Sequence, residues 1–369
     1  MVSPLRLSDE RFRLWSWALI VVGAVQIAVA WQRGLSDWRG FADAGRNVGT
    51  AALLHPRELG DVWAYPPATA WLYAPLAHFP PPLDFAANEV FLLACAVGAA
   101  LIGAGVFALR REAALLMVFA WGPLTSAALV IGQNSPLGLL LAMAAILGFS
   151  RGSLLLTAVP MGLLLYKPTY ALPLIAALLV RGRLRELSIV AVIGALWYLV
   201  SVAAVGGDWM WPSAWFHEVT TYQGAELAKN GAKALDIPVL LRRAGFGFPA
   251  IAAVVSVAAV LAAIPLRRVA AVEAGCAACL IGLALSPHAW GYDGVLALPM
   301  VLFAATHLPE PHRTRWLVLA YLISPLTDLK LLPIDPLAPF VIGGSIAWVV
   351  IRWPKRQRAT AASSAPADA

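Results

Sequence analysis

Long apolar runs alternate with short polar segments along the whole chain. A helix of about 20 apolar residues crosses the roughly 30 Å of hydrocarbon in a bilayer, so this alternation predicts a series of membrane helices. The predicted fold is an all-α polytopic membrane protein with about 10–12 transmembrane helices. We place them at residues 14–31, 85–109, 113–131, 136–150, 153–166, 168–180, 187–205, 247–266, 269–286, 292–307, 315–324 and 336–351.

Two stretches do not fit a simple spanning helix. The pieces 153–166 and 168–180 are each too short to cross unaided and meet at Lys167-Pro168, which predicts a broken or bent helix. Membranes tolerate such a break only where the backbone is buried in protein or lines a cavity. The stretch 64–79 is also short and rich in Trp and Tyr, which predicts an interfacial or half-inserted helix.

The basic residues set the orientation of these helices, because cytoplasmic loops collect Lys and Arg. If every basic cluster faces the cytoplasm, both termini are cytoplasmic and the polar segments share the external side. These segments are residues 32–84, 131–136, 166–168, 206–231, 286–293 and 324–335.

An alternative topology lets residues 64–79 cross the membrane and makes 153–180 one long helix. It agrees with the first topology from Arg181 onward. It places Arg110, Arg111 and Arg151 outside, however, which the positive-inside bias disfavours.

Composition agrees with this pattern and excludes other classes of protein. The 369 residues are 60% hydrophobic and 13% charged, whereas soluble proteins carry about 25% charged residues. Lys and Arg lie in short clusters between apolar runs, so the formal charge of +7 reflects topology and predicts no nucleic-acid partner. We predict one transmembrane domain over residues 1–354 and a low-complexity, disordered cytoplasmic tail at 355–369.

The three cysteines, Cys95, Cys276 and Cys279, all lie in apolar surroundings. The spacing of Cys276 and Cys279 puts two thiols on one helix face, but no further Cys or His ligand lies nearby in the sequence. We therefore interpret them as small buried residues rather than as a redox or metal site.

The external segment 32–84 carries two carboxylates that are candidate bases, Asp37 and Asp43. A carboxylate just outside a membrane helix can be a solvated charge or a helix cap. It can also be a general base at the mouth of a cavity that opens to lipid. Asp43 can pair with Arg46, which makes it the more structural of the two, but both stay candidates.

Aromatic and amide side chains mark two further external segments. The run Trp-Ala-Tyr-Pro-Pro at 63–67, with Tyr65 and Pro66, fits either the aromatic belt of a bilayer or stacking against a sugar ring. Gln133 and Asn134 lie in a very short turn between apolar spans. Their amides can satisfy helix ends or hydrogen-bond to sugar hydroxyls.

Lys167 stands between two apolar pieces with no acidic neighbour in the sequence. A lysine inside a membrane is costly, so it marks either a function or a buried pair. Beside a proline break it suits an anionic headgroup such as a phosphate.

The external loop 286–293 gathers His288, Tyr292 and Asp293 between two spans. A metal site would need a third ligand that the sequence does not provide, so His288 is better interpreted as a hydrogen-bonding or acid–base group. The external segment 206–231, rich in Trp, predicts an amphipathic helix on the membrane surface. Such a helix can anchor the protein or gate its substrate.

Taken in order, these motifs resemble one known family. An Asp-x-x-x-aromatic segment after the first span, a Tyr-Pro-Pro run, a Gly-Gln-Asn turn, a Lys-Pro break and a Ser-Pro-His-x-x-x-Tyr-Asp loop follow one another over residues 14–305. In this order they resemble the bacterial membrane glycosyltransferases of family 87. These belong to the GT-C superfamily and include polyprenol-phosphomannose-dependent α-1,2-mannosyltransferases.

The resemblance implies a GT-C fold with a large first external loop that carries the catalytic aspartate. Asp37 matches that aspartate, with Phe41 in place of the family's usual Tyr, and Asp43 stays an alternative. His288 is expected to be a further catalytic group. The substrate-binding residues that the resemblance implies are Tyr65, Pro66, Gln133, Asn134, Lys167, Tyr292 and Asp293.

The activity implied by the resemblance is inverting transfer of a sugar, with mannose expected, from a polyprenyl-phosphate donor to a glycolipid or glycan acceptor. The reaction is expected on the external face of the cell membrane, in contact with membrane lipids, and without a metal or other cofactor. The alternative is a transporter or flippase of a lipid-linked or anionic substrate, since an intramembrane lysine and broken helices also mark transport paths.

Overall fold

The computed structural model of the chain describes residues 10–33, 36–54, 64–309, 312–326 and 334–352. Within these ranges every regular element is helical, apart from an isolated β-bridge between Ala234 and Trp290. The predicted all-α fold is therefore confirmed. The predicted tail at 355–369 lies outside the described residues.

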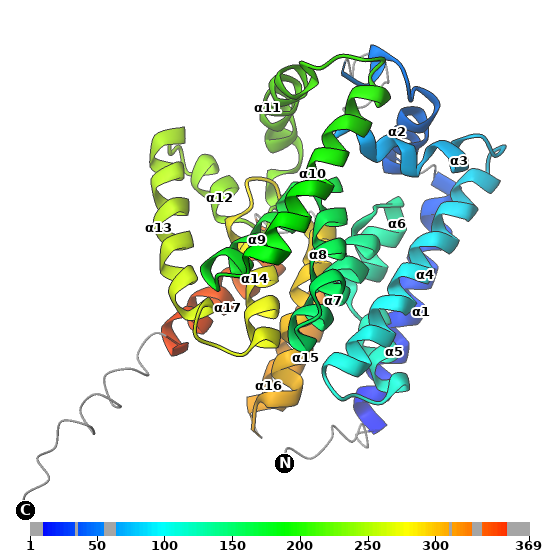
Figure 1. Cartoon of the computed structure of the whole chain (residues 1–369). Helices are drawn as coiled ribbons and strands as arrows, with labels where there is room; N and C mark the ends of the chain where they lie inside the picture. Colours follow the sequence, from blue (N-terminus) through cyan, green and yellow to red (C-terminus); the bar gives the residue numbers. More distant parts are fainter. Residues whose placement is uncertain (1–9, 34–35, 55–63, 310–311, 327–333, 353–369) are drawn as a thin grey trace, which may run out of the picture.

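The helices follow one another along the chain with short connections (Figure 1). The α-helices are α1 Glu10–Arg33, α2 Ser36–Arg46, α3 Ala74–Ala77, α4 Leu83–Val106, α5 Arg111–Phe119, α6 Leu129–Ile131, α7 Ser135–Arg151, α8 Leu154–Leu163, α9 Pro168–Val180, α10 Leu184–Ala204, α11 Trp211–Asn230, α12 Ile237–Arg243, α13 Phe248–Leu266, α14 Ala271–Leu285, α15 Leu298–His307, α16 His312–Ile323 and α17 Leu337–Arg352. The 3₁₀ segments are η1 Ala51–Leu54, η3 Pro67–Leu72, η5 Leu164–Tyr166, η6 Gly231–Lys233, η7 Gly291–Ala297 and η8 Ser324–Leu326, and η4 Pro123–Ala128 is a π-helix.

The apolar helices occupy the places that the apolar runs predict. Three of the described helices, α4, α10 and α13, are long and apolar enough to cross a membrane by themselves, and the pair Arg111–Phe119 and Pro123–Ile131 is a fourth candidate. Shorter apolar helices include α7, α9, α14 and α17. Most of the predicted spans are therefore shorter than a free-standing membrane helix and depend on their neighbours.

The predicted break at Lys167 is present. The helical turns of α8 and η5 end at Tyr166, and α9 begins at Pro168. Lys167 leaves the helical conformation, with φ −134° and ψ 86°. Proline is well suited to the first position of a helix because its missing N–H is not needed there, so Pro168 starts α9 rather than continuing the preceding helix.

The prediction of one continuous span at 113–131 is wrong, because the helix is broken within it. The chain bends by 50° between Phe119 and Pro123, so this stretch is not one straight helix. The bend contains Gly122, where a Cβ atom would lie 2.1 Å from the carbonyl oxygen of Ser324. The close approach of this second backbone therefore requires glycine here.

Two further predictions are wrong in part. Residues 64–79 form two short turns, η3 and α3, rather than one interfacial helix, and a proline stands in the first turn of each. The segment 206–231 does contain a long helix, α11, but the order of apolar and polar residues in its sequence is not that of an amphipathic helix. Trp211 is buried whereas Phe216 is 64% exposed.

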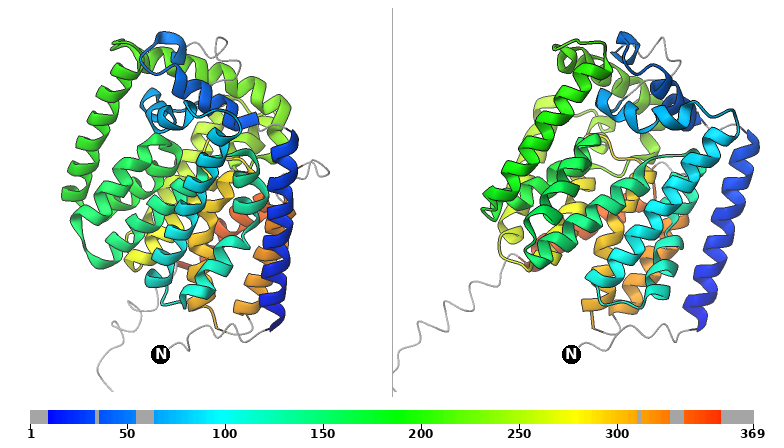
Figure 2. Two further views of the ribbon diagram at one scale, coloured as in Figure 1. Left: turned by 90° about the vertical axis from the view of Figure 1, so that its right-hand side faces the viewer. Right: turned by 45° about the vertical axis from the view of Figure 1, so that its right-hand side comes forward.

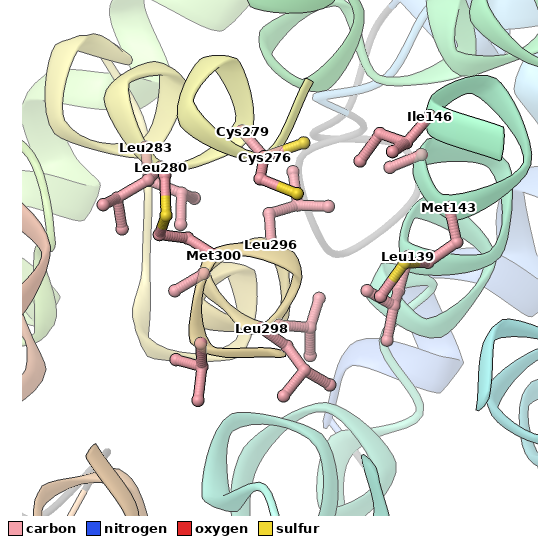
Figure 3. Packing of buried hydrophobic residues seen from close by; sticks show 14 of the residues in the cluster. Leu139, Met143, Ile146, Cys276, Cys279, Leu280, Leu283, Leu296, Leu298 and Met300 are labelled. Carbon is pink, nitrogen blue, oxygen red and sulfur yellow. The ribbon is translucent and has the colours of Figure 1, made fainter. Parts of the chain in front are cut away.

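The core of the bundle lies around α7, which packs against α4, α8 and α14. Figure 3 shows Cys276 and Cys279 of α14 among apolar side chains that include Ile146 of α7. The described cysteines are buried and form no disulfide, as expected for small core residues. Small side chains let these helices approach closely, and a Cβ at Gly275 would lie 2.7 Å from Ile146.

One end of the bundle carries most of the irregular structure. Figures 1 and 2 show α2, α3 and α11 together at this end, where α4 begins and α10 ends. The turn at 132–134, the break at Lys167 and the loop at 286–293 reach the same region, because hydrogen bonds join them to it. Described parts of five of the six polar segments predicted to share one side therefore meet there, namely those of 32–84, 131–136, 166–168, 206–231 and 286–293.

Candidate functional site

Asp37 lies in the first turn of α2, half-buried, where a negative charge is stabilised by the helix N-terminus. Its Oδ2 atom accepts a hydrogen bond of 2.6 Å from Nε2 of Gln133. The carboxylate is thus held by a side chain from the turn between α6 and α7. This contact places Asp37 inside the polar cluster rather than in open solvent.

Aromatic rings form the wall beside Asp37. Phe41 follows one helical turn later on the same face of α2 and is buried. Its ring stacks on Tyr73 with centroids 4.7 Å apart, and the ring of Tyr65 lies 5.5 Å away. Phe41, the residue that departs from the family pattern, therefore holds an aromatic position in this wall.

Asp43 lies on a different face of α2, because six residues turn the helix by about 600°, which leaves the two side chains about 120° apart. Its Oδ1 accepts a hydrogen bond of 2.8 Å from Arg46, and the side chain is 41% exposed. Arg46 also donates to the carbonyl oxygen of Ala77. Asp43 thus belongs to a surface ion pair, which favours Asp37 as the candidate base.

Three tyrosines hold the Gln133-Asn134 turn. The hydroxyl of Tyr65 donates to Oε1 of Gln133 at 2.9 Å and contacts Oδ1 of Asn134 at 3.4 Å. Nδ2 of Asn134 donates to the Tyr73 hydroxyl at 2.9 Å, and the Tyr166 hydroxyl donates to the Asn134 carbonyl at 3.0 Å. The two amides therefore serve the polar cluster and not the helix ends.

Tyr65 stays a neutral donor within this network. Burial raises the pKa of Tyr65 well above its usual value, and the nearby Tyr73, Asp293, Tyr166 and Asp37 raise it further. Its hydroxyl thus keeps its proton for Gln133. Pro66 follows in a buried position and accepts the backbone N–H of Thr69, so it shapes the chain next to Tyr65.

Lys167 is part of a buried ion pair. Its Nζ lies 2.5 Å from Oδ1 of Asp293 and 3.2 Å from the Tyr170 hydroxyl, and the two charged side chains are 8% and 1% exposed. Nζ also lies 4.4, 5.1 and 5.7 Å from the ring centroids of Tyr170, Tyr292 and Tyr65. The counter-ion comes from 126 residues away, which is why no acid stands beside Lys167 in the sequence.

Asp293 uses both carboxylate oxygens. Oδ1 accepts from Lys167 and from the Tyr170 hydroxyl, and Oδ2 accepts from the backbone N–H of Trp290 at 2.8 Å. Asp293 is therefore the counter-ion of Lys167 and also fixes the start of η7. Tyr292 is half-buried beside it.

His288 lies on the same loop as Asp293. Its Nε2 accepts a hydrogen bond of 2.8 Å from Nε1 of Trp290, which fixes a neutral ring with its proton on Nδ1. The described contacts connect His288 to the site through Trp290 and the Trp290–Asp293 hydrogen bond. A role for His288 next to Asp37 remains a prediction.

Sequence reasoning missed four residues, Tyr73, Tyr166, Tyr170 and Asp236. Tyr170 could have been found, because it lies in the first turn of α9, three residues after Lys167 at the N-cap of that helix. Asp236 precedes Ile-Pro at the start of α12, a typical helix start, and accepts the backbone N–H groups of Val239 and Ala289. Its second bond anchors the loop that carries His288.

The remaining predicted features are placed as follows. Trp63 lies outside the described residues, as do the side chains of α11 from 222 onward. The described part of α11 contacts η1 of the external segment 32–84. No group of three or more His, Cys, Asp or Glu residues in the described part of the chain is placed to hold a metal ion.

A continuous chain of contacts links the residues of the polar cluster. Asp37 binds Gln133, Gln133 binds Tyr65, the Tyr65 ring lies below Lys167, and Lys167 binds Asp293. Tyr65 thus contacts both groups: its hydroxyl is linked through Gln133 to the Asp37 carboxylate, and its ring lies near the Lys167 ammonium. This arrangement can take a proton from one reactant and stabilise negative charge on another.

The comparisons with known proteins identify the family of the chain. Searches among curated proteins and among solved structures find no match to the chain. The model of glycosyltransferase family 87 matches residues 63–287, a stretch that includes Tyr65, the Gln133-Asn134 turn and Lys167. This match covers more than half of the chain. The chain therefore belongs to glycosyltransferase family 87.

Proposed function

We propose that the protein is an inverting glycosyltransferase that moves mannose from a polyprenyl-phosphate donor to a glycolipid or glycan acceptor. Glycosyl transfer follows from the family. The donor class is supported by one observation above all. A buried, tyrosine-lined lysine belongs to the same hydrogen-bonded cluster as a carboxylate held by Gln133.

Asp37 is the proposed base. It takes the proton of the acceptor hydroxyl as the acceptor oxygen forms its bond to C1 of the sugar. The bond between C1 and the phosphate oxygen of the donor breaks on the opposite face, and polyprenyl phosphate leaves. A β-linked donor thus gives an α-linked product, as in the base half of an inverting glycosidase.

Lys167 is the proposed partner of the leaving phosphate. An ammonium has three N–H donors. Two of the donors of Lys167 bind Asp293 and the Tyr170 hydroxyl in this structure. A third donor remains for a phosphate oxygen. Asp293 and the tyrosine rings hold the ammonium in place, so little reorganisation is needed when charge develops on the leaving group.

We further propose that the reaction needs no metal or other cofactor. Phosphate is already a good leaving group, so it needs a cation rather than a general acid. Lys167 would supply that charge, and the sugar would arrive on a lipid rather than on a nucleotide. The partners are then the donor, the acceptor and membrane lipids.

We place the reaction on the external side of the cell membrane, with both termini in the cytoplasm. The basic residues support this orientation. Arg110, Arg151, Arg181 and Arg267 lie at helix ends or in turns. Arg181 ends the same helix, α9, that Lys167 begins, so this basic turn lies at the opposite end of α9 from the site.

The test is transfer by the purified protein in proteoliposomes. Radiolabelled polyprenyl-phosphate mannose with envelope glycolipid extract should yield a labelled product, and EDTA should leave the rate unchanged. Nucleotide-linked mannose should give no product. Movement of donor across the sealed vesicle without a new glycosidic bond would instead support the transporter alternative. Transfer only from the nucleotide sugar, or only with added metal, would overturn the proposed donor or the proposed metal independence.

A further inference from the structure

A second site lies at the far end of α9, opposite the proposed catalytic cluster. A cavity of about 420 Å³ is lined by Leu179, Val180, Arg181, Gly182 and Arg267. It joins the turn after α9 to the turn after α13. Helix α9 has 13 residues, so this cavity lies about 20 Å from Lys167 along the helix. It is therefore separate from the donor site.

Arg181 is fixed in position by the protein. Its Nη1 donates to the carbonyl oxygens of Leu266 and Val269 at 3.0 and 2.7 Å, and its guanidinium lies 5.2 Å from the ring centroid of Phe149. Burial and the neighbouring Arg183 lower the pKa of Arg181. A preorganised guanidinium in crowded positive surroundings gains from a bound anion.

Arg267 lies on the other side of the cavity. Its side chain is exposed and makes no hydrogen bond or ion pair with any described residue. Two arginines from separate helix ends thus line one cavity. Like charges brought together in this way repel each other unless an anion lies between them.

The acidic side chains near the cavity already accept hydrogen bonds from other residues. Glu186 accepts hydrogen bonds from Arg183, and Glu273 accepts from Arg352 and from Trp348. On the two turns that form the cavity, the described chain offers no other acid: residues 181–186 hold three arginines and Glu186, and residues 267–273 hold two arginines and Glu273. The positive charge of the cavity is therefore not neutralised by these turns.

The walls of the cavity indicate where its ligand comes from. Leu179 is 61% exposed at the end of an apolar helix, where it faces the lipid side of a membrane protein. The cavity thus has an apolar wall beside two guanidinium groups, at the level where helices end and headgroups begin. Basic pockets between membrane helices bind anionic headgroups in this way.

From these contacts we infer that the cavity at Arg181 and Arg267 binds a phosphate group at the membrane surface, as carried by an anionic phospholipid. The two guanidinium groups bind the phosphate oxygens and Leu179 packs against the start of an acyl chain. This inference does not depend on the proposed function, since it concerns the opposite end of α9. A free phosphate ion has the same anionic chemistry but no acyl chain.

The experiment is calorimetric titration of the purified full-length protein in a neutral detergent with three probes. They are dioctanoyl-phosphatidylglycerol, dioctanoyl-phosphatidylcholine and inorganic phosphate. We expect saturable binding of phosphatidylglycerol that weakens about 10-fold in Arg267→Gln, because one of two charged hydrogen-bonding groups is lost. Arg268→Gln removes the same charge from the next position, outside the cavity, and should bind as the wild type does.

The three probes separate the possible sources of the anion. Binding of phosphatidylglycerol above inorganic phosphate identifies a lipid site, and equal binding of both identifies a phosphate site that does not use the acyl chain. Phosphatidylcholine should bind at least several-fold more weakly, since its headgroup carries no net charge. No saturable binding of either anion, or equal loss in Arg267→Gln and Arg268→Gln, would overturn the inference.

Discussion

Gln133 donates a hydrogen bond of 2.6 Å to Asp37, although 96 residues separate them in the chain. This bond joins α2 to the turn between α6 and α7. The other end of the Gln133 amide accepts from Tyr65. Gln133 therefore holds the proposed base and an aromatic wall of the site at once.

The two aspartates of α2 should differ sharply in their effect on activity. Asp37→Asn keeps the shape of the side chain but removes the base, so we expect the rate of sugar transfer to fall about 10²- to 10⁴-fold. Asp43→Asn loses only a surface ion pair with Arg46 and should stay within about threefold of wild type. Transfer from polyprenyl-phosphate mannose measures both, and a larger loss in the Asp43 variant would make Asp43 the base.

Variants of the buried pair of Lys167 and Asp293 should change the stability of the protein and its rate of sugar transfer independently. Lys167→Met leaves Asp293 buried without its counter-ion and should lower the free energy of unfolding by about 3–5 kcal/mol. The double variant with Asp293→Asn removes both charges and should recover much of that loss. Sugar transfer should stay low in both variants, because the phosphate has lost its cation.

Thermal unfolding in detergent and the transfer assay, run on the same preparations, test this separation. Recovery of activity together with stability in the double variant would show that the charge of Lys167 is structural. Lys167→Arg serves as the control that keeps the charge but changes its geometry.

Asp236 predicts a pH dependence of stability at the loop that carries His288. Burial raises the pKa of Asp236 to about 7, against the lowering effect of the N–H groups of Ala289 and Val239. Because the unfolded carboxyl titrates near 4, the folded protein binds more protons between about pH 4 and 7. The free energy of unfolding should therefore fall as the pH rises through this window.

Asp236→Asn removes this titration, so its stability should change less between about pH 4 and 7 than that of the wild type. Thermal unfolding at a series of pH values measures both curves. Asp208→Asn, which changes an exposed aspartate in the turn before α11, is the control and should follow the wild type. Equal slopes for the wild type and Asp236→Asn would contradict the prediction.

Two glycines test the close packing of the membrane helices. A Cβ at Gly148 of α7 would lie 2.3 Å from the backbone of Leu156, so Gly148→Ala should destabilise the protein by about 2 kcal/mol or more. A Cβ at Gly105 of α4 would meet nothing within 4 Å. Gly105→Ala should then stabilise the helix by about 0.5–1 kcal/mol. Unfolding curves recorded in detergent measure both variants. Equal changes in stability for Gly148→Ala and Gly105→Ala would contradict the packing of α7 against α8.

The sequence predicts the helices well, because hydropathy is a local property. The ends of α7 at Ser135 and Arg151 lie within one residue of the expected span, and the break at Lys167 follows from Pro168. The bend near Gly122 was missed, since its cause is the distant backbone of Ser324. A helix that looks continuous in the sequence can thus be bent by a neighbour.

The site was predictable as a set of polar segments, but its pairings were not. Lys167 and Asp293 were both candidates, yet nothing local to either residue indicates that they bind each other. Asp43 was correctly linked to Arg46, because three residues on a helix bring two side chains together. Asp236 was missed because its role lies in contacts with a loop that is distant in the sequence.

Helix α9 begins at Pro168, beside Lys167, and ends at Val180, beside Arg181. Near its middle it lies tightly against α14, where a Cβ at Gly282 would be 2.3 Å from Pro173. Both ends of this roughly 20 Å helix are held as well, by the ion pair of Lys167 with Asp293 and by the hydrogen bonds of Arg181 to Leu266 and Val269. Helix α9 is therefore fixed at three points along its length. It acts as a spacer that keeps the ammonium group and the basic cavity at a constant separation.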